Sequence, residues 1–162
     1  NQQYLLKLPE EEYFRMIDDV IQKGDYHDQD PGKIRQAAEI LKTRLVTLSD
    51  LNQKLGLFFE ENPEIKDLQA IEVLKEDNSK TVLKEFLQQA ENLDQLTSEN
   101  LGQLVKSVQK TTGIKGRGLW MPLRCAITRE VSGPELPAML DFFGGEKCLH
   151  LIRQALENPS LN

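Results

Sequence analysis

Apolar residues recur at intervals of three and four along almost the whole chain, and proline or glycine interrupts several of the runs. The first run, with Tyr13, Ile17 and Ile21, follows Pro9 and stops before Gly24. Such spacing places side chains on one face of an α-helix, whereas a half-buried strand would alternate with a period of two. No stretch keeps that alternation long enough to build a sheet. The sequence therefore predicts an all-α protein.

The predicted core faces follow from the apolar positions of each helical segment. They are Tyr13, Ile17, Val20 and Ile21; Ile34, Ala37, Ala38, Leu41 and Leu45; Leu51, Leu55, Phe58 and Phe59; 68–74; Val82, Phe86, Ala90 and Leu93; Leu101, Leu104, Val105 and Val108; Leu119, Leu123, Ala126 and Ile127; Leu136, Met139, Leu140 and Phe143; and Leu149, Ile152 and Leu156. Asn62-Pro63 breaks the series, because the residue before a proline disfavours helix. We expect a two-part helical bundle with subdomains 1–62 and 63–162 and no internal repeat.

Several classes of protein are disfavoured by composition. No apolar run approaches the roughly 20 residues that span a bilayer, and the first eight residues lack the pattern of a signal peptide. Two cysteines and two histidines in 162 residues, with no CxxC pair, argue against a zinc finger and a disulfide framework. We therefore expect a cytoplasmic protein that does not enter membranes. The start, Asn-Gln-Gln without Met, predicts a fragment of a longer chain.

Charge is distributed unevenly along the chain. The net charge is −6, yet residues 101–129 hold six basic residues and no Asp or Glu, which leaves 14 basic and 26 acidic residues, a charge of −12, elsewhere. The six are Lys106, Lys110, Lys115, Arg117, Arg124 and Arg129. Such a patch can bind a polyanion by releasing counterions, and a solvated basic face is the alternative.

Catalytic and metal-binding patterns are weak. Acidic pairs such as Asp18-Asp19 are typical of solvated helix surfaces. Cys148 and His150 are two residues apart, so a helix would point them to different faces, and Cys148 fits a core position. The glycine-containing segment 115–118 lacks the full phosphate-loop pattern. We expect no catalytic residue, no metal site and no cofactor in this chain.

A mixed stripe of side chains lies between Arg117 and Thr128. On a helix, Arg117, Trp120, Arg124 and Thr128 fall three and four residues apart, so cations, an aromatic ring and a hydroxyl share one face. Rings stack on unpaired bases and guanidinium groups hold phosphates or base edges. Two alternatives stay open: the single tryptophan as a core anchor, and Arg124 as an ion-pair partner.

The same stretch carries a resemblance to a known family. The run 115–128, KGRGLWMPLRCAIT, followed by Gly133-Pro134-Glu135-Leu136, resembles the C-terminal anticodon-binding region of bacterial glutamyl-tRNA synthetases. In the first half, RLVTLSDL at 44–51 resembles the R-x-x-T-L-x-x-L element of that family, and 144–156 resembles its final helix. The chain departs from the pattern at Arg129-Glu130, where many members have a glycine-containing turn.

The resemblance implies a two-part, all-helical cage attached to a class I catalytic domain that uses ATP and Mg²⁺ to attach glutamate to tRNA. No H-x-G-H-like or K-M-S-K-S-like motif occurs, so the ATP chemistry is not expected of this piece. The implied partner is tRNA(Glu), with tRNA(Gln) left open. We expect a monomer that binds no DNA.

The resemblance also implies site residues. Arg124 with the turn Gly133, Pro134 and Leu136 meets the first anticodon base, and Arg44 reads the third base. Together with the residue patterns, it suggests as tRNA backbone contacts Lys106, Lys110, Lys115, Arg117, Trp120 and Thr128. The rival hypothesis from the residues is a helical protein-interaction domain, whose binding through apolar faces would depend little on salt.

Overall fold

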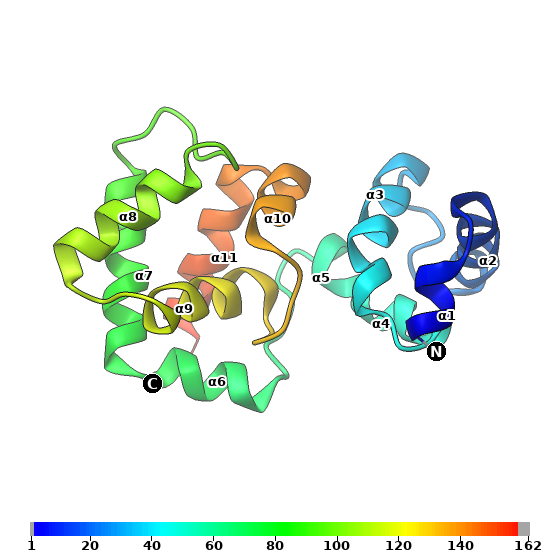
Figure 1. Ribbon diagram of the computed structural model, residues 1–162, viewed down its shortest axis with the longest axis horizontal. Coiled ribbons are helices and arrows are strands. Elements are labelled where there is room, and N and C mark those ends of the chain that lie inside the picture. Colours follow the sequence, from blue (N-terminus) through cyan, green and yellow to red (C-terminus); the bar gives the residue numbers. More distant parts are fainter. Residues whose placement is uncertain (1, 159–162) are drawn as a thin grey trace. The chain divides into compact units, whose positions relative to one another are not determined.

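The computed structural model describes residues 2–158, and within that range it contains helices and 3₁₀ turns but no strand. The chain divides into two compact units between Glu61 and Asn62. The helical elements of the first unit are α1 (Gln2–Lys7), α2 (Glu10–Lys23), α3 (Pro31–Leu41), the 3₁₀ turns η1 (Lys42–Arg44) and η2 (Leu48–Asp50), α4 (Leu51–Lys54) and α5 (Gly56–Phe59). Those of the second are α6 (Leu68–Lys75), α7 (Asp77–Ala90), α8 (Leu101–Thr112), α9 (Arg117–Thr128), α10 (Leu136–Phe143) and α11 (Gly145–Glu157) (Figure 1). The predicted all-α fold is confirmed.

The first unit is organised by α2 and α3, whose ends follow the sequence signals. Asp30 accepts a hydrogen bond from the backbone N–H of Lys33 at 3.0 Å, and Pro31 occupies the first turn of α3. An N-cap carboxylate and an early proline both favour a helix start. The phenol of Tyr13, fully buried, donates to the Ala38 carbonyl at 2.8 Å and so joins α2 to α3.

The predicted third helix is interrupted. It consists of η2, α4 and α5, with the break at Leu55-Gly56, where glycine lowers helix propensity. The glycine also permits a close approach, because a Cβ on Gly56 would lie 3.2 Å from the Tyr26 hydroxyl. Leu51, Leu55 and Phe58 are buried as expected. The prediction for Phe59 was wrong, since it is only half-buried.

The second unit is built around α9, which packs against α6, α7, α10 and α11. Figure 1 shows α7 and α8 side by side, with α9 crossing in front of the unit. The largest fully buried side chains of this unit come from four helices: Leu83 and Phe86 of α7, Leu119, Leu123 and Ile127 of α9, Met139 of α10, and Leu151 of α11. Gly113, at φ +75°, ends α8 in the left-handed conformation that glycine adopts without strain.

Four predicted core positions of the second unit, Leu93, Phe143, Leu149 and Leu156, are only half-buried. Leu93 lies beyond the end of α7 and is half-buried, and on α10 the buried ring is Phe142, whereas Phe143 is half-buried. The predicted face of α11 was displaced by about one residue, because the fully buried positions are Cys148, Leu151, Ile152 and Ala155. Only the neighbours of a helix decide which edge of a broad apolar face is covered. No helix within 2–158 has both the length and the apolar character needed to cross a bilayer.

Candidate nucleic-acid interface

Four of the predicted cations lie exposed on the second unit. In α8 the buried positions Leu104 and Val108 alternate with Lys106 and Lys110, which face solvent one turn apart. Lys115 and Arg117 are exposed in the segment that connects α8 to α9 and in the first turn of α9. None of these four cations pairs with a carboxylate among residues 2–158, so their charges are available to an anion.

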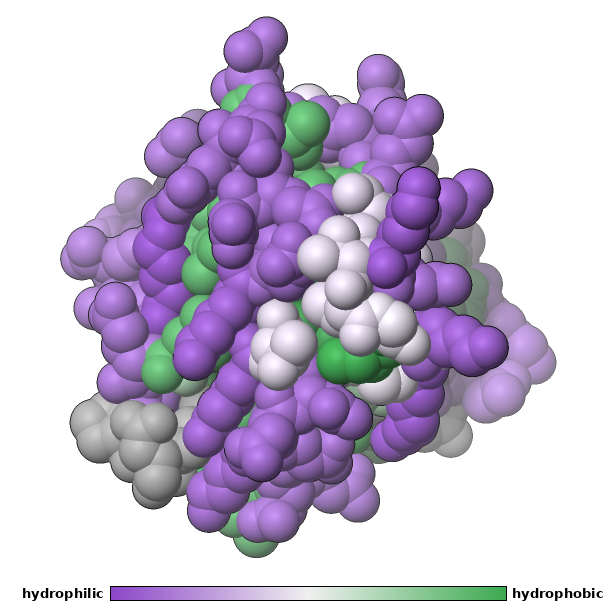
Figure 2. All heavy atoms as spheres, turned by 90° about the vertical axis from the view of Figure 1, so that its left-hand side faces the viewer, coloured by the Kyte–Doolittle hydropathy of each residue, from purple (hydrophilic) through white to green (hydrophobic). Residues whose placement is uncertain are grey.

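The face of the second unit on the side of α7 and α8 is largely hydrophilic. Figure 2 shows this face, with mostly hydrophilic side chains around a pale area that has green beside it near the middle of the view. The connection from α8 to α9 needs two left-handed residues, Gly113 at φ +75° and Gly116 at φ +64°. Glycine has no Cβ to oppose that conformation, so the chain reverses within a few residues and presents Lys115 outward.

Trp120 is exposed, which contradicts the alternative of a core anchor. Its side chain points away from the interior of the unit, with 41% of its surface accessible, whereas Leu119 and Leu123 of the same helix are buried. The aromatic ring is therefore on the solvent side of α9, on the same face as Arg117 three residues before it.

Arg124, on the same predicted helical face as Arg117 and Trp120, is half-buried. Its guanidinium donates to the Gly133 carbonyl at 2.7 Å and lies 3.4 Å from a carboxylate oxygen of Glu135. The Arg124 side chain retains 23% exposure, and that of Glu135 retains 71%. The ion-pair alternative is confirmed, and the same contacts fasten the turn that precedes α10 to α9.

The turn at Gly133 is tightly packed. Gly133, Pro134 and Leu136 are all buried, so the side chains of Pro134 and Leu136 face the unit rather than solvent. Thr128, 1% exposed, has its hydroxyl 2.8 Å from the Arg124 carbonyl oxygen and 2.9 Å from that of Glu130. Thr128 was predicted to contact a tRNA backbone, but its burial and these two acceptors remove it from the candidate surface.

Arg44 lies in the first unit, in the 3₁₀ turn η1 that follows the end of α3. It is half-buried. The chain after it is fixed by a capping box, in which Asp50 accepts from the backbone N–H of Thr47 at 3.0 Å. That hydrogen bond lowers the pKa of the Asp50 carboxyl. Arg44 is therefore outside the α-helix proper, just before an ordered turn.

A sequence model of the family described as "Anticodon binding domain" matches residues 6–156, nearly the whole chain. This chain belongs to the anticodon-binding domain family. Among similar proteins are the glutamate–tRNA ligases of Lactiplantibacillus plantarum, 35% identical over 151 residues (90% of this chain, 30% of that protein), and of Geobacillus stearothermophilus, 40% identical over 101 residues (62% and 20%).

Solved structures show the same fold. A crystal structure of a glutamate tRNA ligase from Elizabethkingia meningosepticum superposes with a TM-score of 0.71 at 22% identity, over 98% of this chain and 31% of that one. This anticodon-binding domain thus spans less than a third of the lengths of the proteins it matches.

Sequence reasoning missed the role of Arg129. We counted it in the basic patch, but it is 6% exposed and contributes no surface charge. Its guanidinium donates to the carbonyls of Pro63 and Leu151 at 3.0 Å each, to that of Ala126, and to the side-chain oxygen of Gln154 at 3.2 Å. Burial lowers its pKa to about 10. Arg129 also adopts φ +65°, a left-handed conformation that glycine adopts without strain.

Neither cysteine of the domain is a reactive site. Cys125 and Cys148 are fully buried and free, and burial raises the pKa of both thiols to about 12. A thiol with so high a pKa is protonated at neutral pH and is a poor nucleophile. Both cysteines fill the core of the second unit. Within residues 2–158, no cluster of three potential metal ligands occurs.

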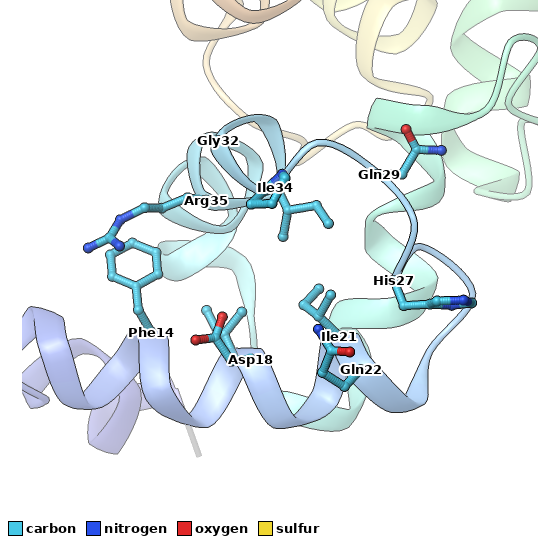
Figure 3. Close-up of a pocket in the computed structure, with 11 residues that line it drawn as sticks. Phe14, Asp18, Ile21, Gln22, His27, Gln29, Gly32, Ile34 and Arg35 are labelled. Atoms are coloured by element: carbon cyan, nitrogen blue, oxygen red, sulfur yellow. The ribbon is translucent and has the colours of Figure 1, made fainter.

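A pocket of about 420 Å³ opens between α2 and α3 of the first unit. Figure 3 shows Ile21 and Ile34 pointing into it from the two helices, and the Arg35 guanidinium lying over the ring of Phe14, 4.0 Å from the ring centre. Arg35 also approaches Glu10 at 3.9 Å. None of the residues predicted to contact tRNA lines this pocket.

Proposed function

We propose that this domain binds the anticodon of tRNA(Glu) as part of a glutamate–tRNA ligase. The observation that carries the proposal is the family match over residues 6–156, together with the exposed, unpaired cations of the second unit. Attachment of glutamate, with ATP and Mg²⁺, belongs in this proposal to the part of such ligases that the chain does not span. We extend the proposal to a monomeric, cytoplasmic enzyme with no role in DNA binding.

The backbone of the anticodon loop is held, in this proposal, by Lys106, Lys110, Lys115 and Arg117. These side chains supply a sequence-independent, salt-sensitive part of the affinity, because each neutralised phosphate releases counterions. The acidic remainder of the chain, with a net charge of −12 outside residues 101–129, opposes docking of RNA elsewhere.

The first anticodon base is assigned to Arg124 and the turn at Gly133. Two of the five guanidinium N–H groups are engaged by Gly133 and Glu135, which leaves three donors for a base edge. Glu135 is the more replaceable of the two partners, since its side chain is 71% exposed and the contact is long at 3.4 Å. The buried carbonyl of Gly133 keeps Arg124 oriented while the base binds, so the arginine is preorganised.

The third anticodon base is assigned to Arg44. Glutamate anticodons end in cytosine, whose exposed N3 and O2 are acceptors, and glutamine anticodons end in guanine, whose N1–H and N2–H₂ are donors. Arginine has donors only, so it serves the cytosine edge and leaves donors facing donors on much of the guanine edge. Whether the ligase also charges tRNA(Gln) then depends on how strongly Arg44 discriminates.

The proposal is tested by titrating the 162-residue chain with an anticodon stem-loop RNA at several salt concentrations. Binding should weaken steeply as the salt concentration rises. In the double variant Lys106→Ala/Lys110→Ala, the plot of the logarithm of the binding constant against the logarithm of the salt concentration should be less steep by about 1–2. Lys23→Ala is the matched control, because Lys23 is exposed but already pairs with Asp19 at 3.1 Å. A chain that binds no stem-loop, or binds with no salt dependence, would contradict the proposal.

A further inference from the structure

Trp120 is the single tryptophan of the chain, and its indole is partly open to solvent. Because Leu119 and Leu123 occupy the buried side of α9, the helix itself directs Trp120 outward. Among residues 2–158, no side-chain hydrogen bond, aromatic contact or cation–π pair involves the indole. The indole therefore has no polar or aromatic partner among the described residues, and 41% of Trp120 stays accessible.

The charges beside Trp120 favour an anionic partner. Arg117 lies three residues before it, on the same helical face, and Lys115 precedes the helix; both are exposed and without an ion pair among the described residues. No Asp or Glu occurs between Leu101 and Arg129. A protein surface that used Trp120 as an apolar anchor would have to desolvate these cations, whereas a nucleic acid would neutralise them.

The position of Trp120 relative to Arg124 adds a second constraint. Trp120 precedes Arg124 by four residues, so the two side chains leave α9 one helical turn apart on the same face. Arg124 is fixed by Gly133 and Glu135, whereas Trp120 has no such attachment. A single strand that placed one base at Arg124 would therefore bring a neighbouring nucleotide to the indole.

We propose that Trp120 stacks on one unpaired base of the bound anticodon loop, next to the base held at Arg124, while Lys115 and Arg117 contact the adjoining phosphates. This inference rests on the proposed function and adds a binding residue to it. Stacking tolerates every base, because each has a flat π face, so Trp120 raises affinity and keeps the loop unstacked. Arg124 and Arg44, not Trp120, discriminate between the bases in this proposal.

The test uses the intrinsic fluorescence of Trp120, which reports on this one residue without a label. Anticodon stem-loop RNA should quench the emission in parallel with binding measured by filter retention. Three further stem-loops each carry an abasic site at one of the three anticodon positions. All three should bind, but one of them should quench the Trp120 fluorescence much less than the intact RNA does. That RNA identifies the base that stacks.

Two substitutions separate stacking from general contact. Trp120→Leu keeps an apolar side chain but removes the extended ring, and should weaken stem-loop binding at least about five-fold, while Trp120→Phe should recover part of the loss. Leu68→Ala is the matched control, because Leu68 is an exposed apolar residue of the same unit, at the start of α6. The variant Trp120→Leu should bind the abasic RNA identified by fluorescence as tightly as it binds the intact RNA, because the base that would stack has no ring to stack on in this variant.

The outcomes distinguish this inference from the proposed function. If the wild-type chain binds no stem-loop RNA, the proposed function fails and the inference fails with it. If the chain binds with the expected salt dependence, but RNA leaves the fluorescence unchanged and Trp120→Leu binds as tightly as wild type, stacking is overturned and the proposed function stands. Quenching together with a five-fold or greater loss in Trp120→Leu supports the inference.

Discussion

Replacing Arg129 should destabilise this domain more than replacing any exposed cation, although Arg129 cannot touch RNA. Its guanidinium donates four hydrogen bonds, to Pro63, Ala126, Leu151 and Gln154, and so joins the C-terminal end of α9 and the middle of α11 to the segment before α6. The Ala126 carbonyl lies in the last turn of α9, where carbonyls lack a partner within the helix and need such a donor. We consider the substitutions Arg129→Ala and Arg129→Gly.

The magnitude follows from the contacts. Hydrogen bonds to charged groups contribute about 1.5–3 kcal/mol each, so four give at least about 6 kcal/mol. Burial opposes these hydrogen bonds, because the guanidinium loses its hydration, and the same burial lowers the pKa of Arg129 to about 10. Arg129→Ala should therefore lower the free energy of unfolding by about 3 kcal/mol or more.

The backbone conformation makes a separate contribution. At φ +65° a residue with a Cβ is strained by about 1–2 kcal/mol, and glycine is not. Arg129→Gly removes the same hydrogen bonds as Arg129→Ala but also the strain, so it should be more stable than Arg129→Ala by about 1 kcal/mol.

Urea unfolding followed by circular dichroism measures both differences. Arg117→Ala is the control, at the start of the helix that Arg129 follows. Because Arg117 is exposed and unpaired among the described residues, the free energy of unfolding of this variant should stay within about 0.5 kcal/mol of wild type. A loss below about 1 kcal/mol for Arg129→Ala would refute the role of the hydrogen bonds. An Arg129→Gly variant less stable than Arg129→Ala would refute the backbone argument.

Three further predictions concern other residues. Gly133→Ala should cost about 2 kcal/mol or more in urea unfolding, since its Cβ would lie 2.2 Å from the Thr128 hydroxyl oxygen; an unchanged midpoint would contradict this packing. Burial raises the pKa of Cys125 and Cys148 to about 12, so the folded chain keeps protons that the unfolded chain loses above about pH 9. Stability should fall from pH 8 to pH 10 by about 2–3 kcal/mol through these thiols, and the double Cys→Ala variant should show a correspondingly flatter dependence in urea unfolding. Arg44→Gln should reduce the preference for cytosine over guanine at the third anticodon position by about 1–3 kcal/mol, measured with two stem-loops that differ at that base; an unchanged ratio would overturn the assignment.

The candidate site was only partly predictable. Lys106 and Lys110 are exposed as their helical spacing indicates, because a solvent position on an amphipathic helix follows from the buried positions beside it. Thr128 shares the spacing of Arg117 and Trp120 yet is buried, because another segment of the chain covers that end of α9. Helical spacing defines a face but not what packs against it.

The sequence by itself determined the helices and most of their buried faces, because capping residues, glycine stops and apolar spacing act within a few residues of one another. Tertiary structure alone decided which polar side chains became internal. Arg124 and Arg129 belong to the same basic segment as Lys106, but one is tied to Gly133 and the other is enclosed by Pro63 and α11. Carbonyl groups from distant parts of the chain stabilise a buried guanidinium. Local sequence patterns do not predict such contacts, because the partners come together only in the folded chain.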